Sequence, residues 1–409
     1  MSMTESSMAT TVTGERPRLA VLGAGPTGLE AALAADHRGW DVVVYEQAAH
    51  VAASVRRWGH VRLFTPWSMN LSAGQQAVCD EPGDSCPTGH EYAAHLDRVA
   101  ALLPDVRLCT RVEALGRAGL LKSEEIASDR RRDTPFRLLV TGPDGRERAE
   151  YADAVLDCTG TYGHPNPTGD GGIPAPGERE LADRIMRSIP EITPEWADQT
   201  VLLIGAGYSA QTVARDLATV GASLIWAIRA SAPTWGAVPA DPLPERAALV
   251  ASSQRIAAGE VPGAELITGV VVEAMRPAGD RIAVTVRDAA GGTRVIEADR
   301  VVSMTGSVGD AGLYRQLQVH ECYATEGPIT LAASLLGAAG GDCLDQTSAG
   351  VEALRNPEPR FFVLGSKSYG RNNTFLLRVG WQQVEEVLDA LDAERDADLP
   401  AGSSAASAG

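Results

Sequence analysis

Two glycine-rich loops of one kind, each between an apolar strand pattern and a helix pattern, constrain this chain most strongly. The first is Gly23-Ala-Gly25-Pro26-Thr27-Gly28, and the second is Gly205-Ala-Gly207-Tyr208-Ser209-Ala210. In such a loop the first glycine permits a tight turn, the second lets the backbone approach a pyrophosphate, and the third small residue lets the helix pack on the strand. The helix N-terminus then attracts the pyrophosphate. The sequence therefore predicts two dinucleotide-binding units.

The end of the second strand in each unit predicts which dinucleotide it binds. The strand over 41–46 ends at Glu46, which is followed by Gln47, and an acid in this place accepts hydrogen bonds from ribose hydroxyls. The strand over 223–229 ends at Arg229 instead, and arginine can bind a 2′-phosphate through two hydrogen bonds. We therefore expect NADPH at the second loop. Because two adjacent nicotinamides would serve no chemistry, we expect FAD at the first loop, where it would accept hydride from NADPH.

Strand and helix patterns alternate between residues 18 and 396, which predicts an α/β fold with parallel sheets. We expect two Rossmann-like domains, with the NADPH domain inserted in the FAD domain. The predicted FAD domain covers 18–165 and 295–396, the NADPH domain covers 195–294, and 1–17 and 397–409 are flexible tails. Single strands are predicted over 106–112 and over 294–306.

Composition excludes several classes of partner. The chain has 36 Lys+Arg and 53 Asp+Glu, with a formal net charge of −17, so neither nucleic acid nor an anionic membrane is expected as a partner. No apolar run reaches the roughly 18 residues of a membrane-spanning helix, and no secretory signal opens the sequence. The six cysteines are too few for a disulfide framework, so a cytoplasmic location is expected. His320, Cys322 and Cys343 fall short of a zinc pattern, so no metal is expected.

Further motifs resemble the flavoproteins that have two dinucleotide-binding domains. These motifs are Asp157-Cys-Thr-Gly160, Ser303-Met-Thr-Gly306, and Phe361-Phe-Val-Leu-Gly365 followed by Phe375-Leu-Leu. The resemblance implies that FAD is contacted by the first loop and the ribose acid, and by positions farther along the chain. These FAD residues are Gly23, Gly25, Pro26, Thr27, Gly28, Glu46, Gln47, Val112, Thr159, Gly160, Gly365, Phe375 and Leu376. The implied NADPH residues are Gly205, Gly207, Tyr208, Ser209, Ala210 and Arg229.

Within this group the sequence is most similar to the single-component, NADPH-dependent flavin-containing monooxygenases. The similarity lies in Pro87-Thr-Gly-His-Glu-Tyr92, in the stretch 159–165, and in Arg229 with Trp235 shortly after it. It implies a small-molecule substrate and molecular oxygen. One oxygen atom would be inserted at nitrogen, at sulfur or beside a carbonyl (Baeyer–Villiger oxygenation), through a C4a-(hydro)peroxyflavin.

Two other functions stay open: a flavin reductase or dehydrogenase that passes electrons to a quinone, a protein or a small molecule, and a non-catalytic flavin- or NADPH-binding sensor. No two cysteines have the Cys-x-x-Cys or Cys-x4-Cys spacing, so a thiol–disulfide relay is not expected. The candidate catalytic residues Lys367, Arg371 and Asn373 lie in a segment dense in hydrogen-bond donors, which could instead be a solvated loop. His60, Arg62 and Trp67 are weaker candidates for positions beside the flavin. The sequence leaves the substrate and the oligomeric state open.

Overall fold

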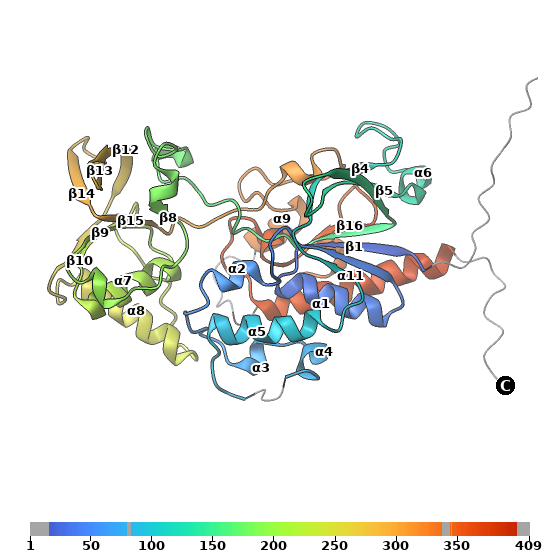
Figure 1. Ribbon diagram of the computed structural model, residues 1–409, viewed down its shortest axis with the longest axis horizontal. Helices are drawn as coiled ribbons and strands as arrows, with labels where there is room; N and C mark the ends of the chain where they lie inside the picture. Colours follow the sequence, from blue (N-terminus) through green and yellow to red (C-terminus); the bar gives the residue numbers. More distant parts are fainter. Residues whose placement is uncertain (1–15, 80–82, 338–343, 345, 399–409) are drawn as a thin grey trace, which may run out of the picture.

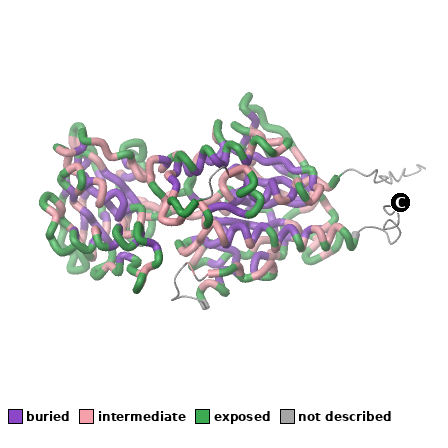
Figure 2. Tube along the Cα trace, turned by 90° about the horizontal axis from the view of Figure 1, so that it is seen from below, coloured by how far each residue is buried: buried purple, intermediate pink, exposed green. Residues whose placement is uncertain are grey.

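The computed structural model describes residues 16–79, 83–337, 344 and 346–398, and it consists of two lobes (Figure 1). The chain starts in one lobe, passes to the second, and returns to the first for its last strand and its long C-terminal helix. In Figure 2 the buried stretches run through the middle of both lobes, and exposed stretches lie around them. Each lobe therefore has a core of its own.

The first lobe is built on a sheet of five parallel strands in the order β16-β7-β1-β2-β3. The strands are β1 (Arg18–Leu22), β2 (Asp41–Tyr45), β3 (Val106–Arg107), β7 (Ala154–Asp157) and β16 (Phe361–Val363). The inner strands are almost continuously buried because both faces of the sheet are covered, which explains why their sequences are apolar runs without alternation.

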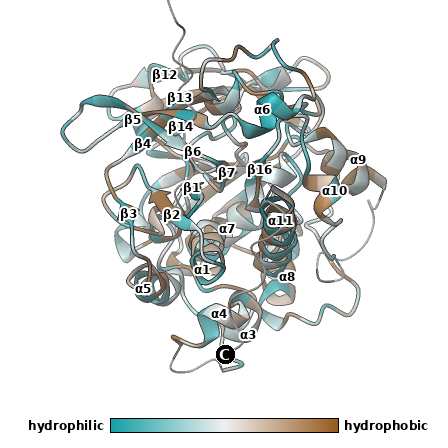
Figure 3. Ribbon diagram, turned by 90° about the vertical axis from the view of Figure 1, so that its right-hand side faces the viewer, coloured by the Kyte–Doolittle hydropathy of each residue, from teal (hydrophilic) through white to brown (hydrophobic). Residues whose placement is uncertain are grey.

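Two layers cover the faces of this sheet (Figure 3). One face packs against the helices α1 (Pro26–His37), α5 (Gly89–Ala100) and α11 (Leu377–Asp398). The other packs against an antiparallel sheet of β4 (Arg111–Arg117), β5 (Phe136–Thr141) and β6 (Glu147–Ala152). Alternate residues of β1 supply the two cores, with Leu19 and Val21 facing the helices and Ala20 and Leu22 facing the antiparallel sheet.

The second lobe repeats this plan, with a parallel sheet in the order β11-β10-β9-β15-β8. The strands are β8 (Ile185–Met186), β9 (Thr200–Ile204), β10 (Ser223–Ala227), β11 (Ala264–Ile267) and β15 (Arg300–Ser303). The helices α7 (Tyr208–Val220) and α8 (Pro244–Ala257) cover one face, and the antiparallel strands β12 (Val270–Ala278), β13 (Arg281–Asp288) and β14 (Thr293–Ala298) cover the other.

Shorter elements complete the two lobes. The short α-helices are α2 (Ala53–Arg56), α3 (Trp67–Asn70), α4 (Ala73–Gln76), α6 (Asp129–Asp133), α9 (Ile329–Gly337) and α10 (Val351–Leu354). Short 3-10 helices occur at Asp170–Gly172, Ala182–Arg184, Pro194–Trp196, Gly312–Tyr314 and Gly365–Tyr369. Among the described residues, no helix is both long enough and apolar enough to cross a membrane.

The structure corrects two predicted strands. The run 106–112 is divided into β3 and β4, because Cys109 has a positive φ of 49° and turns the chain between them. The run 294–306 is divided into β14 and β15, which belong to different sheets. The strand β15 pairs with β9, and β8 pairs with β15. The second lobe therefore includes residues before 195 and after 294, the ends of its predicted range. Most of each predicted tail lies outside the described residues.

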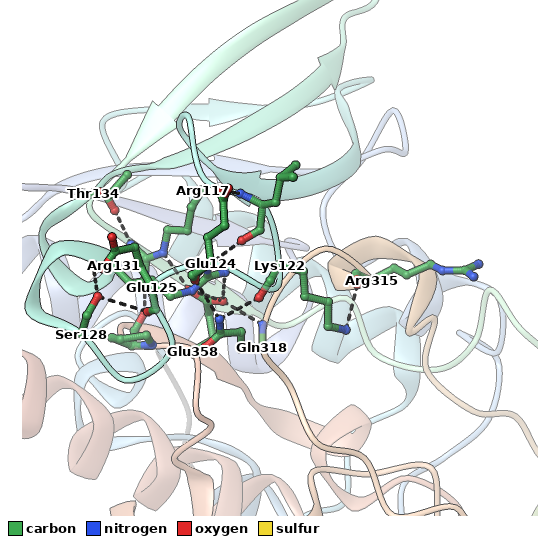
Figure 4. A network of polar contacts seen from close by, with 12 residues as sticks. Arg117, Lys122, Glu124, Glu125, Ser128, Arg131, Thr134, Arg315, Gln318 and Glu358 are labelled. Carbon is green, nitrogen blue, oxygen red and sulfur yellow. Dashed lines mark hydrogen bonds and ion pairs between the residues drawn. The ribbon is translucent and has the colours of Figure 1, made fainter.

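A buried ionic cluster ties the insertion between β4 and β5 to the segment before β16 (Figure 4). The carboxylate of Glu358 accepts hydrogen bonds from Arg117 Nε at 2.7 Å and Arg131 Nη2 at 2.7 Å, and from the backbone N–H of Gln318 at 2.8 Å. The side chains of the three charged residues are fully buried. The other nitrogen atoms of the two guanidinium groups donate to backbone carbonyls. The polar groups of the cluster therefore bind one another, and the cluster is structural.

Candidate functional site

The first glycine loop has the geometry of a dinucleotide site. Gly23 has a positive φ of 95°, and a Cβ there would lie 2.7 Å from the carbonyl oxygen of Cys158. A Cβ on Gly28 would lie 1.9 Å from the carbonyl oxygen of Gly23, so the helix can approach the strand only with glycine at this place. A Cβ on Gly25 would contact nothing within 4 Å. The open side of the loop is therefore where a pyrophosphate fits.

Glu46 closes the other end of this site. It follows β2, and its carboxylate accepts hydrogen bonds from the N–H of Ala24 at 2.9 Å and the N–H of Ala48 at 2.8 Å. These bonds hold the carboxylate beside the glycine loop, where it can also accept hydrogen bonds from a ribose. α1 begins directly after the loop with Pro26 at its first position and without a side-chain cap, so its first N–H groups are free for an anion.

A cavity of about 690 Å³ joins the two lobes along this loop. It is lined by most of the residues predicted to contact FAD, namely Gly23, Gly25, Pro26, Thr27, Glu46, Gln47, Val112, Thr159, Gly160, Gly365, Phe375 and Leu376. Gly28 is outside the lining because it packs against the strand. The structure thus brings together residues from five separate parts of the sequence.

The second loop repeats the geometry of the first. Gly205 has a positive φ of 118°, and a Cβ there would lie 2.2 Å from the carbonyl oxygen of Met304. Gly207 has nothing within 4 Å of a Cβ, and Ala210 is fully buried against the strand. Tyr208 and Ser209 line the cavity shared with the first loop. The strand β10 ends at Ala227, before the predicted end at Arg229, and Arg229 lies exposed beyond it, outside that lining.

The three candidate catalytic residues occupy different environments. Lys367 is buried, and its Nζ donates to Asp157 Oδ2 at 2.6 Å, to Thr159 Oγ1 at 3.0 Å and to the carbonyl of Asp310 at 2.9 Å. Arg371 forms an ion pair with Glu326 at 2.8 Å. Neither Lys367 nor Arg371 is among the residues that line the cavity, whereas Asn373 is.

Several lining residues were absent from the predicted site. Asn70 is buried at the cavity wall, and its amide donates to the carbonyls of Thr65 at 2.8 Å and Pro66 at 2.9 Å. Tyr92 lies beside it and donates to the carbonyl of Asn70 at 3.2 Å. No local pattern marks these residues, because α3 and α5 meet only in the folded chain. Of the three weaker candidates, Arg62 lines the cavity, and His60 and Trp67 do not.

No thiol pair lies at the site in the described part of the chain. Cys79, Cys86, Cys109, Cys158 and Cys322 are all free. Cys158 borders the cavity, but burial raises the pKa of its thiol, which keeps it protonated and unreactive. Within the described ranges, no three His, Cys, Asp or Glu side chains are grouped to hold a metal ion, and Cys343 lies outside those ranges.

Comparisons with known proteins agree with this geometry. A family model described as pyridine nucleotide-disulphide oxidoreductase matches residues 17–323. The flavin-containing monooxygenase FMO GS-OX-like 2 of Arabidopsis thaliana is 24% identical over 241 residues, which are 53% of this chain and 50% of that protein. The chain thus spans about half the length of this curated relative.

Solved structures show the same fold at low sequence identity. The bacillithiol disulfide reductase Bdr from Bacillus cereus superposes with a TM-score of 0.69 at 18% identity, covering 93% of this chain and all of the other. The ornithine N-hydroxylase KtzI from Kutzneria sp. 744 superposes with a TM-score of 0.63 at 14% identity, with the same coverage. The predicted cofactors, FAD and NADPH, are those of this family. The chain belongs to the pyridine nucleotide-disulphide oxidoreductase family and is an FAD- and NAD(P)H-dependent oxidoreductase.

Proposed function

We propose that this protein is an NADPH-consuming flavin monooxygenase that inserts one oxygen atom into a small molecule. The observation that carries the proposal is the shared cavity, which borders both the first glycine loop and Tyr208 and Ser209 of the second. A nicotinamide dinucleotide and FAD can therefore meet in one cavity. The described chain offers no thiol pair there to take the electrons onward, and the flavin-containing monooxygenase of Arabidopsis is a sequence relative.

The chain's own residues would hold the two cofactors. Gly25 and the free N–H groups of α1 would bind the FAD pyrophosphate, and Glu46 would bind its ribose. Gly207 and the N-terminus of α7 would bind the NADPH pyrophosphate, while exposed Arg229 would bind the 2′-phosphate. When bound, the flavin supplies the redox chemistry by accepting hydride and reacting with oxygen.

Apolar walls would keep water away from the reacting atoms. Val61, Leu63 and Phe64 line the cavity from the first lobe, and Ile189 and Leu243 line it from the second. Exclusion of water from such a space prevents side reactions of a reactive intermediate and strengthens every polar contact inside. This arrangement suits a monooxygenase better than a protein that hands electrons to a large partner.

Polar residues at the wall would orient a substrate. Asn373 lines the cavity next to Thr374 and Phe375 and offers an amide that can donate and accept hydrogen bonds. We assign the substrate-binding role to Asn373, and a positioning role to Lys367, because all three donors of its amine are already engaged. The composition favours a small-molecule substrate and a cytoplasmic location.

The proposal is tested by following oxygen atoms. The holoenzyme is incubated with NADPH, ¹⁸O₂ and separate panels of amines, organic sulfides and ketones, and products are analysed by mass spectrometry. One ¹⁸O atom per product, formed with one NADPH consumed, supports the monooxygenase. If every panel yields only hydrogen peroxide, while a quinone or a disulfide accepts electrons rapidly without oxygen, the reductase alternative replaces it.

A further inference from the structure

A segment of the first lobe lies beside the phosphate loop of the second. The ring of Phe64 contacts the ring of Tyr208 edge to face, with the centroids 5.7 Å apart and the planes at 71°. Arg62, Leu63 and Phe64 line the same cavity as Tyr208, Ser209 and Thr212. Tyr208 is the first residue of α7. The segment 61–65 therefore borders the place where the NADPH pyrophosphate is expected.

The guanidinium of Arg62 has no acidic partner in this cavity. Three other arginines line the cavity: Arg111 pairs with Glu113 at 3.1 Å, Arg246 pairs with Asp241 at 2.7 Å, and Arg57 donates to the carbonyl of Tyr162 at 3.1 Å. Of Arg57 and Arg62, only Arg62 lies in the segment 61–65 that borders Tyr208. Arg62 donates to the carbonyl of Cys86 and forms no ion pair with a described carboxylate, and its electrostatic interaction with Glu91 acts at longer range. In a chain with a net charge of −17, a lining arginine without a carboxylate is well suited to an anionic ligand.

The backbone holds Arg62 in place before any ligand binds. The N–H of Leu63 donates to the carbonyl of Pro87 at 2.8 Å, and the N–H of Gly89 donates to the carbonyl of Val61 at 2.9 Å. These bonds join the segment to the start of α5 like a short antiparallel ladder. A side chain on a fixed backbone loses less conformational entropy when it binds an anion.

The N-terminus of α7 can contribute to binding the same anion. Gly207 is its N-cap residue and provides no side-chain cap, and the first turn contains no acidic residue. No side chain caps this end of the helix, and the positive end of its dipole points toward the cavity that Tyr208 and Ser209 line. Arg62 would approach a phosphate held there from the opposite lobe.

We propose that Arg62 binds the pyrophosphate of NADPH from the FAD lobe, so that the nucleotide is held by both lobes at once. Arg229 takes the 2′-phosphate, and the two arginines divide the recognition of the nucleotide between them. This inference rests on NADPH as the cofactor and is independent of whether the electrons go to oxygen or to another acceptor.

Nucleotide fragments separate the two roles. The FAD-loaded protein is titrated calorimetrically, at fixed ionic strength, with NADP⁺, NAD⁺ and adenosine 2′-monophosphate. We expect R62Q to weaken NADP⁺ and NAD⁺ binding by roughly ten- to a hundredfold, which is the effect of one charge-assisted hydrogen-bonded contact, and to leave adenosine 2′-monophosphate unchanged. R229Q should weaken NADP⁺ and adenosine 2′-monophosphate and leave NAD⁺ unchanged.

Two further variants provide the controls. R137Q removes the same charge from an exposed position on β5, outside the cavity, and should bind all three ligands like the parent protein. R62K keeps the charge without the planar fork and should fall between the parent and R62Q. The proposal is wrong if R62Q binds NADP⁺ as tightly as R137Q does, or if R62Q loses adenosine 2′-monophosphate as well. If the R62Q protein does not bind FAD, R62K takes its place in this comparison. The proposal then requires that R62K bind NADP⁺ more weakly than R137Q does.

Discussion

The buried ion pair of Lys367 and Asp157 provides the sharpest test of what holds the first lobe together beside the cavity. The side chain of Asp157 is fully buried and that of Lys367 is 2% exposed, and their charged atoms lie 2.6 Å apart. Lys367 also donates to Thr159 and to the carbonyl of Asp310. One amine therefore joins the end of β7, the segment returning from the second lobe, and the loop after β16.

Replacement of Lys367 by methionine would leave the Asp157 carboxylate buried without a counter-ion. Breaking one side of a buried ion pair costs about 3–5 kcal/mol, since the remaining charge keeps its desolvation penalty. For a unit of 150–250 residues, each 1 kcal/mol lowers the Tm by about 2–4 °C. We therefore expect the flavin lobe of Lys367→Met to melt roughly 6–20 °C lower.

The double variant Lys367→Met/Asp157→Asn separates charge from packing. Asparagine is neutral and can still accept the two hydrogen bonds that Thr159 donates to Asp157 Oδ1. We expect the double variant to recover at least half of the lost Tm. Melting is followed by circular dichroism and by release of flavin fluorescence. Equal Tm values for the single and double variants would refute the electrostatic argument, and so would a single variant as stable as the parent.

Three more predictions follow from the geometry. Gly25→Ala should leave the Tm of the FAD-free protein unchanged and lower its affinity for FAD, whereas Gly28→Ala should lower both, because its Cβ would meet a carbonyl oxygen at 1.9 Å; titration of the FAD-free proteins with FAD checks this. The pKa of buried His95 is lowered to about 4 by burial and by Arg98, against about 6.5 when unfolded. Between pH 6.5 and pH 4, His95 is therefore protonated in the unfolded chain but neutral in the folded protein. The free energy of unfolding falls as the pH drops through this range, by at most about 1.4 kcal/mol per pH unit. His95→Phe should remove that part of the slope in urea titrations, and a slope equal to the parent's would contradict the assignment. Arg229→Glu should raise the KM for NADPH far more than the KM for NADH in steady-state assays, and equal effects would exclude the 2′-phosphate contact.

The two dinucleotide units were predictable because their signals are local. The turn at Gly23, the open side at Gly25 and the close helix–strand contact at Gly28 occur within six residues, and each needs glycine for a reason that the sequence alone displays. Glu46 is equally predictable, because it directly follows the second strand and its carboxylate accepts a hydrogen bond from Ala24 in the glycine loop. Tertiary packing has little freedom to alter such a unit.

The roles of the other residues depend on contacts across long stretches of chain. Lys367 looked like a free donor in its own segment, but its partner Asp157 is 210 positions earlier. The strand β15 has a short buried apolar stretch, as the strands of the first sheet do, and nothing local shows that it pairs with β9 in the second sheet. Asn70 gave no signal because its place at the cavity depends on how α3 meets α5. Such features follow from the assembled core and not from periodicity.

The central claim is that the electrons of NADPH reach molecular oxygen and then a small molecule in the shared cavity. The most direct measurement reduces the FAD-loaded protein with one equivalent of NADPH without oxygen, and then mixes it separately with oxygen, a quinone and a low-molecular-weight disulfide. The account predicts that oxygen consumes the reduced flavin fastest, and that added substrate diverts the product from hydrogen peroxide to an oxygenated molecule. Rapid reoxidation by the quinone or the disulfide, with oxygen slow and substrate without effect, would contradict it.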